Sequence, residues 1–355
     1  MNANELKLEY PWQDRLPEAG KTLAVADGVR WLRMPLPFAL DHINLWLLRD
    51  QIDGREGWTV VDTGVARPEV KELWNQIFEQ ELDGLPVLRV IVTHMHPDHV
   101  GLADWICNRW QAPLWMSMTD YAIARLWSQP AVDAAGQGAT GLAAEAHFVR
   151  HGLQDQSARE QIRSRGNYFP TLVPAVPARF RRLMHGERIS IGGRDWQVIV
   201  GYGHAPEHVS LYSESLRVLI SGDMLLPRIS TNVSVFEHEP EANPLPLYLN
   251  SLREYDPLEA DTLVLPSHGK PFKGMHERVR QQWEHHAERL EEVFQACSEP
   301  QTAADILPIM FRRKLDSHQL TFAMGEALAH LHALYFEGRL KRLLAEDGVY
   351  RFVQA

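Results

Sequence analysis

The stretch THMHPDHVG, residues 93–101, places four potential metal ligands within six consecutive positions: His94, His96, Asp98 and His99. The apolar run VLRVIVT at 87–93 leads into it and predicts a buried strand. Imidazole and carboxylate groups are ligands that suit zinc, iron or manganese. Four of them on one loop supply most of a coordination shell, which predicts a metal site where this strand ends.

Three further potential ligands also follow apolar, strand-like runs. They are His204 in GYGHAPEH, Asp223 in LISGDML and His268 in VLPSHGKPF. Any one of them alone is more often an ordinary loop residue, but ligands at strand ends converge on one edge of a sheet. Together with the loop at 93–101, they predict one site built from seven side chains.

Strand-like and helical patterns alternate through most of the chain. Apolar runs between turn signals predict strands and hairpins over 22–63, and an i, i+3, i+4, i+7 apolar stripe predicts a helix over 68–81. A helix-rich stretch at 119–184 interrupts the strands, which return at RISIGG, WQVIVGYG, VSLYSES, LRVLISGD and DTLVLPSHG. This order is typical of α/β proteins. We expect 119–184 to be an insertion that acts as a lid.

The pattern changes again after about residue 275. Three helical stretches precede two short apolar runs around the sequence EDG at 346–348, which predicts a β-hairpin. Thr302, with Asp305 three positions later, predicts the start of the second helix. Three helices and a hairpin are typical of a winged-helix domain. We therefore expect a main domain at 1–275 and a winged-helix-like α+β domain at 276–355.

The ordered ligand set resembles the metallo-β-lactamase superfamily, whose HxHxDH loop, later His, Asp and final His are matched over about residues 20–275. The resemblance implies an αββα fold, in which two sheets pack face to face between outer helices, with a dinuclear metal centre at one edge. With the C-terminal domain, the chain resembles the branch of β-lactamase-like protein 2 and glyoxalase II. The resemblance also implies which ligands share an ion: His94, His96 and His204 for one, Asp98, His99 and His268 for the other, with Asp223 bridging both.

Seven ligands are too many for one tetrahedral zinc, but they suit two ions that share a carboxylate and a hydroxide. We expect two divalent metal ions, with zinc (Zn2+) favoured and iron or manganese also compatible with these ligands. Two such ions acidify a shared water and polarise the scissile bond, which predicts hydrolysis by a metal-bridging hydroxide. By resemblance, Asp98 also accepts a hydrogen bond from the nucleophilic water, so it is the expected catalytic residue.

Other residues are candidates for supporting the site or contacting substrate. By resemblance, Asp62 in VVDTG supports the metal loop through hydrogen bonds. His208, four residues after His204, could orient a ligand or contact substrate, and a purely structural histidine is the alternative. Arg179 and Arg182 could bind an anionic substrate group, and a solvated run of charges is the alternative.

Composition and charge narrow the function classes. With 45% hydrophobic and 23% charged residues, the 355-residue chain matches a soluble globular protein. The chain has a net charge of −10, and residues 276–355 contain 10 basic and 12 acidic residues. Nucleic-acid binding favours positive charge, so both charge balances argue against it. Two cysteines without a CxxC pair favour a cytoplasmic location, and no run approaches the ~18 apolar residues of a membrane span. We expect a small-molecule substrate. Whether the chain forms a homodimer is left open by the sequence.

The favoured reaction is hydrolysis of an acyl thioester or ester. The insertion combines the aromatic residues Trp127, Phe148, Tyr168 and Phe169 with a basic end, which suits an acyl group on an anionic carrier. By resemblance, hydrolysis of β-lactams is disfavoured because true β-lactamases lack the carboxylate at Asp223. Hydrolysis of RNA or other phosphodiesters, hydrolysis of lactones, and a binding module without catalysis are the alternatives.

Overall fold

The computed structural model describes residues 4–355 apart from 39, 130–138, 165–167, 312–314 and 316. Contacts within it divide the chain into two compact units. Unit 1 comprises Met1–Gln129, Phe169–Thr231 and Leu252–Val279, and unit 2 comprises Pro130–Tyr168, Asn232–Ser251 and Arg280–Ala355.

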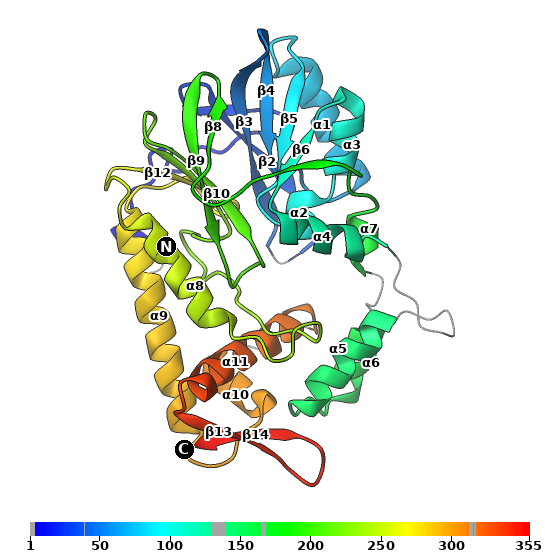
Figure 1. Ribbon diagram of the computed structural model, residues 1–355, viewed down its shortest axis with the longest axis vertical. Coiled ribbons are helices and arrows are strands. Elements are labelled where there is room, and N and C mark those ends of the chain that lie inside the picture. The colour runs from blue at the N-terminus through cyan, green and yellow to red at the C-terminus, as the bar shows by residue number, and fades with distance from the viewer. Residues whose placement is uncertain (1–3, 39, 130–138, 165–167, 312–314, 316) are drawn as a thin grey trace. The chain divides into compact units, whose positions relative to one another are not determined.

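Unit 1 contains two β-sheets (Figure 1). The first has seven strands in chain order, β1 to β4 antiparallel and β4 to β7 parallel. Its strands are β1 (Leu23–Ala26), β2 (Val29–Pro35), β3 (His42–Ile52), β4 (Arg55–Val61), β5 (Val87–Ile91), β6 (Leu114–Met116) and β7 (Phe180–Arg182). The strands and hairpins predicted over 22–63 are confirmed.

The second sheet has five strands in the order β12-β11-β10-β9-β8, with β11 and β12 parallel and the others antiparallel. They are β8 (Arg188–Ile191), β9 (Arg194–Gly201), β10 (His208–Ser213), β11 (Val218–Gly222) and β12 (Leu263–Pro266). These strands correspond to the five strand-like runs that return after the insertion.

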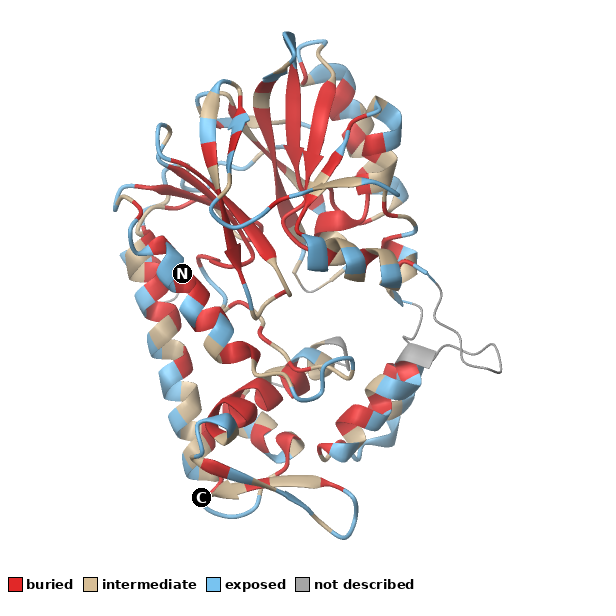
Figure 2. Ribbon diagram, in the orientation of Figure 1, coloured by how far each residue is buried: buried red, intermediate tan, exposed pale blue. Residues whose placement is uncertain are grey.

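Alternating side chains of the first sheet supply two separate layers of core. Trp46 on β3 belongs to a buried cluster shared with Trp196 of the second sheet. Its neighbour Leu45 points the other way, into a cluster with α1 (Pro68–Gln80) and α3 (Ala103–Trp110). In Figure 2, the inner strands β5, β10 and β11 are buried along their whole length. The expected mixed α/β sandwich is therefore confirmed, as is the helix predicted over 68–81.

Besides the 3-10 helices Glu5–Lys7 and Arg253–Tyr255, three further short helices lie wholly or mostly in unit 1. They are α2 (Pro97–Val100), α4 (Met118–Trp127) and α7 (Tyr168–Leu172). Throughout the described ranges of both units, each helix is too short or too polar to cross a membrane.

Unit 2 is largely helical and ends in a two-stranded sheet. Its elements are α5 (Ala139–Arg150), α6 (Gln156–Ser164), α8 (Pro244–Leu252), most of α9 (Met275–Ala296), α10 (Ala303–Met310), α11 (Ser317–Phe336), β13 (Leu340–Leu344) and β14 (Tyr350–Gln354). Thr302 and Asp305 form a capping box at the start of α10, which confirms the predicted helix start. The order of three helices and a hairpin is also present, and its interpretation as a winged helix stays a prediction.

Most of the predicted insertion, residues 130–168, groups with the C-terminal residues in unit 2. The backbone N–H of Ala304 donates to the His151 carbonyl oxygen at 3.2 Å, and the His151 and Tyr350 rings lie 5.4 Å apart. The domain boundary expected at residue 275 and the role of 119–184 as a lid stay predictions.

Candidate metal centre

The loop at 93–101 makes a tight turn directly after β5. Pro97 occupies the first position of α2, where a missing N–H leaves no helical hydrogen bond unmade. His96 precedes it as the N-cap residue, and its carbonyl oxygen accepts from the backbone N–H of His99 and of Val100, each at 3.0 Å. This turn lets four side chains within six consecutive positions reach one site.

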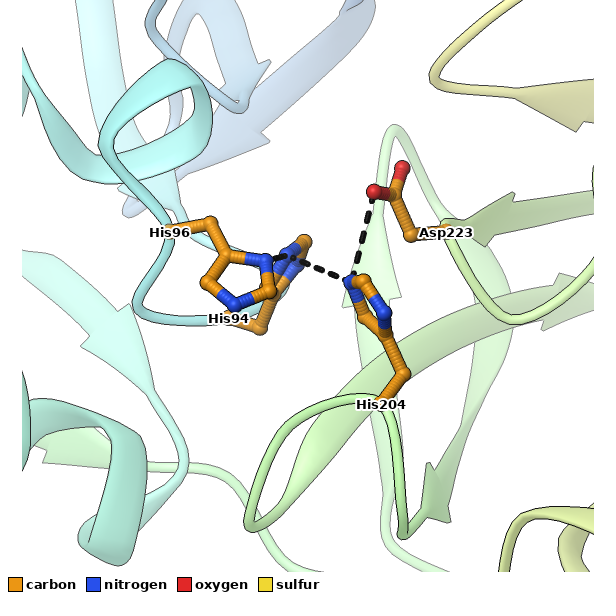
Figure 3. Close-up of side chains that lie close together, drawn as sticks. All are labelled: His94, His96, His204 and Asp223. Carbon is orange, nitrogen blue, oxygen red and sulfur yellow. Dashed lines mark hydrogen bonds and ion pairs between the residues drawn. The ribbon is translucent and has the colours of Figure 1, made fainter. Parts of the chain in front are cut away.

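The first group of ligand-type residues contains His94, His96, His204 and Asp223, whose candidate atoms all lie within 4.8 Å of one another. His94 Nε2 lies 2.8 Å from His96 Nδ1 and 3.2 Å from His204 Nε2. Asp223 Oδ2 lies 3.3 Å from His204 Nε2 (Figure 3). The His94–His96 turn, the loop after β9 and the end of β11 therefore meet at one point.

The second group contains Asp98, His99 and His268. Asp98 Oδ2 lies 3.4 Å from His268 Nε2 and 3.7 Å from His99 Nε2. The other oxygen of Asp223, Oδ1, lies 3.5 Å from His268 Nε2 and 3.6 Å from His99 Nε2. Asp223 thus faces both groups, one carboxylate oxygen toward each.

Hydrogen bonds at Nδ1 leave three histidines with Nε2 turned toward the site. His94 Nδ1 bonds to the Thr93 hydroxyl (3.0 Å), His99 Nδ1 to Asp62 Oδ2 (2.8 Å) and His268 Nδ1 to the carbonyl oxygen of His42 (2.8 Å). A donor at Nδ1 leaves a lone pair at Nε2 for a metal ion. His99 Nε2 and Asp223 Oδ1 are buried without a hydrogen-bond partner among the described residues. Unpartnered buried atoms of this kind fit a cation between them.

The two groups differ in their electrostatics. Burial, helped by neighbouring histidines, lowers the pKa of His94 well below its usual value and that of His96 to about 3, which keeps both rings neutral. Around His99 and His268, burial is outweighed by nearby carboxylates, which raise their pKa values to about 9 and about 10. The second group therefore attracts positive charge strongly.

Asp62, directly after β4, supports the loop at 93–101. Its backbone φ is +62°, and its side chain is buried. Oδ1 accepts from the backbone N–H of Thr93 (2.8 Å), while Oδ2 accepts from the Thr93 hydroxyl (2.9 Å) and from His99 Nδ1. These contacts orient the His99 ring and anchor the start of the loop.

His208, the first residue of β10, packs against the turn formed by Gly222 and Asp223. Its Nε2 accepts from the backbone N–H of Asp223. A Cβ atom at Gly222 would lie 2.3 Å from that nitrogen, so this turn requires glycine. The structure brings His208 against the backbone of Asp223 and leaves it out of both groups of ligand-type residues.

Asp120 is a buried residue near the site that sequence reasoning missed. Its Oδ1 accepts from the backbone N–H of Met95 (2.8 Å) and its Oδ2 from that of Glu207 (2.6 Å). Burial raises the pKa of this carboxyl group to about 6. The only local signal is Ser117 three positions before it, a spacing typical of a capping box. The Ser117 side chain does not cap the helix backbone, but its hydroxyl donates to Asp120 Oδ2 at 3.4 Å.

His42 and Asn44, both on β3, also contact the turn that follows β12. His42 Nε2 accepts from the backbone N–H of Gly269 at 3.0 Å. The Asn44 amide donates to the carbonyl oxygens of Pro266 and Gly269. Together they hold the turn that carries His268.

The basic residues at the end of the predicted insertion lie on or beside the edge strand β7. Arg182 is the last residue of β7, and its Nη2 lies 3.9 Å from Glu207 Oε1. Arg179 is exposed and precedes the strand. Arg182 therefore has an ion-pair partner three residues after His204, and neither arginine belongs to the two ligand groups.

Comparison with known proteins identifies the family. The model of the metallo-beta-lactamase superfamily matches residues 39–268, which include all seven ligand-type residues. The chain belongs to the metallo-beta-lactamase superfamily. A second model, described as the metallo-beta-lactamase-like C-terminal domain, matches residues 290–355. Within this superfamily fold, the His/Asp cluster is suited to a dinuclear metal site.

Individual relatives agree with the metallo-beta-lactamase fold. The crystal structure of a beta-lactamase domain protein from Burkholderia ambifaria is 56% identical, covers 100% of both chains and has a TM-score of 0.93. The probable metallo-hydrolase YqjP of Bacillus subtilis is 24% identical over 332 residues, which cover 90% of this chain and 96% of the relative. A hydroxyacylglutathione hydrolase of Chromohalobacter salexigens is 34% identical over 77 residues, 22% of this chain and 26% of the relative.

Proposed function

We propose that this chain is a metal-dependent hydrolase with a dinuclear centre, and that it acts on an acyl thioester or ester. The main observation in support is the position of Asp223. Its Oδ2 lies 3.3 Å from His204 Nε2, and its Oδ1 lies 3.5 Å from His268 Nε2. A carboxylate between two groups of nitrogen and oxygen ligands is what a two-metal hydrolytic centre requires.

The donor set divides naturally between two ions. His99 Nε2 and Asp223 Oδ1, which are buried with no hydrogen-bond partner in the described part of the chain, are 3.6 Å apart, which supports a cation near them. Nitrogen and oxygen donors favour zinc and also suit iron or manganese. When bound, the ions would lower the pKa of a water molecule toward ~7 and polarise the substrate carbonyl. The proposed ligands are His94, His96 and His204 for one ion, Asp98, His99 and His268 for the other, and Asp223 for both.

The chain's own residues would position the reactants. The Asp98 side chain keeps 15% exposure, more than the 0% of His99 and 3% of His268, so it faces an arriving water. As a carboxylate with a pKa of about 2, it can accept a hydrogen bond from that water and orient it. Asp62 and His208 would act through the ligands that they hold, His99 and Asp223.

Two features support an acyl substrate with an anionic portion. The relative named hydroxyacylglutathione hydrolase bears an acylglutathione substrate in its name. Tyr202, two residues before His204, is 42% exposed, and Met184, two residues after Arg182, is 53% exposed. Exposed apolar groups beside a basic one suit an acyl chain on an anionic carrier. Of the four aromatic residues that the sequence offers for an acyl group, Phe148 is not accessible, because it is 1% exposed and packs inside unit 2.

A metal-loaded activity panel tests the proposal. We expect kcat/KM for acyl thioesters and nitrophenyl esters to exceed that for lactones, phosphodiesters and short RNA. The activity should be lost on chelation and return with added metal, and Asp98→Ala should lower kcat by about two orders of magnitude or more.

Other outcomes would overturn parts of the proposal. Efficient RNA cleavage without acyl hydrolysis would support a nuclease. A protein that binds no metal and turns over none of these substrates would support a binding module. Elemental analysis after loading should find two ions per chain, and one or none would sink the dinuclear assignment.

A further inference from the structure

Asp120 connects two segments that carry ligands of the first group. Met95, whose backbone N–H donates to Oδ1, lies between His94 and His96. Glu207, whose backbone N–H donates to Oδ2, lies three residues after His204. One carboxylate therefore bonds to the backbone of both segments, which meet where His94 Nε2 and His204 Nε2 are 3.2 Å apart.

A second bond links the same helix start to the His204 segment in the opposite direction. The backbone N–H of Thr119 donates to Glu207 Oε2 at 2.9 Å. At the start of α4, the Asp120 carboxylate thus accepts from the backbone N–H of Glu207, and the backbone N–H of Thr119 donates to the Glu207 carboxylate. This pair of bonds keeps the His204 segment in register with α4.

The burial of Asp120 indicates a specific role. Its side chain is 0% exposed, and burying a carboxylate is unfavourable unless hydrogen bonds compensate it. The two backbone N–H groups are strong, charge-assisted donors at 2.8 and 2.6 Å. An apolar residue would fill the space without this penalty, but it could not join the two segments.

We propose that Asp120 is a positioning residue that preassembles His94, His96 and His204 by bonding to the backbone of both segments that carry them. This inference rests on the proposed metal centre and extends it to a residue outside the seven ligands. The second group should depend on Asp120 much less, because Asp62 holds the His99 ring and the carbonyl oxygen of His42 holds the His268 ring.

The test is a metal titration of Asp120→Asn with a chromophoric chelator as competitor. The amide keeps the size of the side chain but presents an NH2 group to one backbone N–H, so one of the two bonds is lost. We expect one of the two metal sites to weaken about 10- to 100-fold while the other stays near the wild-type affinity. Activity should return toward the wild-type kcat in excess metal.

A matched control is Asp104→Asn. Asp104 also lies in the first turn of a helix in unit 1, but its carboxylate accepts from Asn108 on the same helix. This variant makes the same chemical change without touching either ligand segment. Its two metal affinities should equal those of the wild type.

Further measurements keep the proposal testable if Asp120→Asn does not fold. Asp120→Glu keeps the charge but displaces it by one methylene, and it should weaken the same single site. In the metal-free wild-type protein, the amides of Met95 and Glu207 should exchange slowly with solvent.

Three results would separate the two proposals. If the wild type binds no metal, the proposed function fails. If the wild type binds two ions and Asp120→Asn binds both equally well, only the role of Asp120 fails. Rapid exchange of the Met95 and Glu207 amides in the folded wild type would also refute that role.

Discussion

His208 Nε2 accepts a hydrogen bond from the backbone N–H of Asp223 at 3.0 Å. The His208 ring is 0% exposed, and its centroid lies 4.7 Å from that of His94. Since the bond is to the backbone, the Asp223 carboxylate remains directed at the two ligand groups. His208 therefore sets the position of a candidate bridging ligand without being a ligand itself.

This relationship predicts different consequences for Asp223→Asn and His208→Ala. Asp223→Asn removes a negative charge that faces both groups, so both ions should bind more weakly and kcat should fall. His208→Ala keeps all seven ligands, so its metal loss should be smaller. Elemental analysis after dialysis against metal-buffered solution measures the difference. Equal metal loss from the two changes would contradict this division of roles.

Gly222→Ala should destabilise the folded protein more than an ordinary substitution at a glycine with left-handed backbone conformation. Gly222 has φ +53°, and an added Cβ would meet the buried His208 ring at 2.3 Å. Gly193 has φ +73° with nothing within 4 Å of an added Cβ, so Gly193→Ala is the matched control. Backbone strain should lower the free energy of unfolding by about 1–2 kcal/mol in both variants.

In Gly222→Ala alone, the clash with His208 should lower the free energy of unfolding by a further ~1–3 kcal/mol. It should also reduce the metal content of this variant. Urea unfolding of the two variants, with elemental analysis of each, provides the comparison. Identical stability and metal content would show that the Gly222 turn tolerates a side chain.

Arg182→Ala should raise KM for anionic acyl substrates by about two- to fivefold. This change corresponds to the loss of one exposed ion pair, which contributes ~0.5–1 kcal/mol. The Arg182 side chain is 52% exposed and lies near Glu207, three residues after His204. Arg179→Ala should act in the same direction. Arg188→Ala, an exposed arginine on β8 of the other sheet, is the control. An equal rise in KM for neutral esters would mean that the arginines do not recognise charge.

Unit 2 contains buried histidines that are neutral near pH 7. Burial lowers their pKa values, to about 4 for His147 and His330 and to about 3 for His151. The pKa values of His286 and His332 are lowered by burial as well. In the unfolded chain these groups titrate near pH 6.5. The folded state therefore binds fewer protons than the unfolded state as the pH falls below about 6.5.

It follows that unit 2 loses stability between about pH 6.5 and pH 4, by ~1.4 kcal/mol per pH unit for each of His147, His151 and His330. Glu326 opposes this trend, because burial raises its pKa to about 7 and favours the folded state toward acid. His151→Phe removes one titrating group next to the Tyr350 ring and should flatten the pH dependence of urea unfolding. An unchanged slope in His151→Phe would refute this account.

The sequence alone determined much of the fold and the candidate ligand set. The strands over 22–63, the helix at 68–80 and the capping box of Thr302 and Asp305 depend on contacts within a few residues, which periodicity and spacing record. The HxHxDH loop is equally local. His204, Asp223 and His268 were predicted because each follows a strand, and strand ends meet at a sheet edge.

The tertiary structure decided the contacts between residues that are distant in sequence. Asp120 stands three positions after a serine, a spacing typical of a helix cap, and yet its carboxylate bonds to Met95 and Glu207. Residues 130–168 group with the C-terminal part of the chain, and Phe148 is a core residue there. The physical reason is that local spacing specifies helices, strands and turns, whereas a buried polar group takes whichever donors the packed segments bring to it.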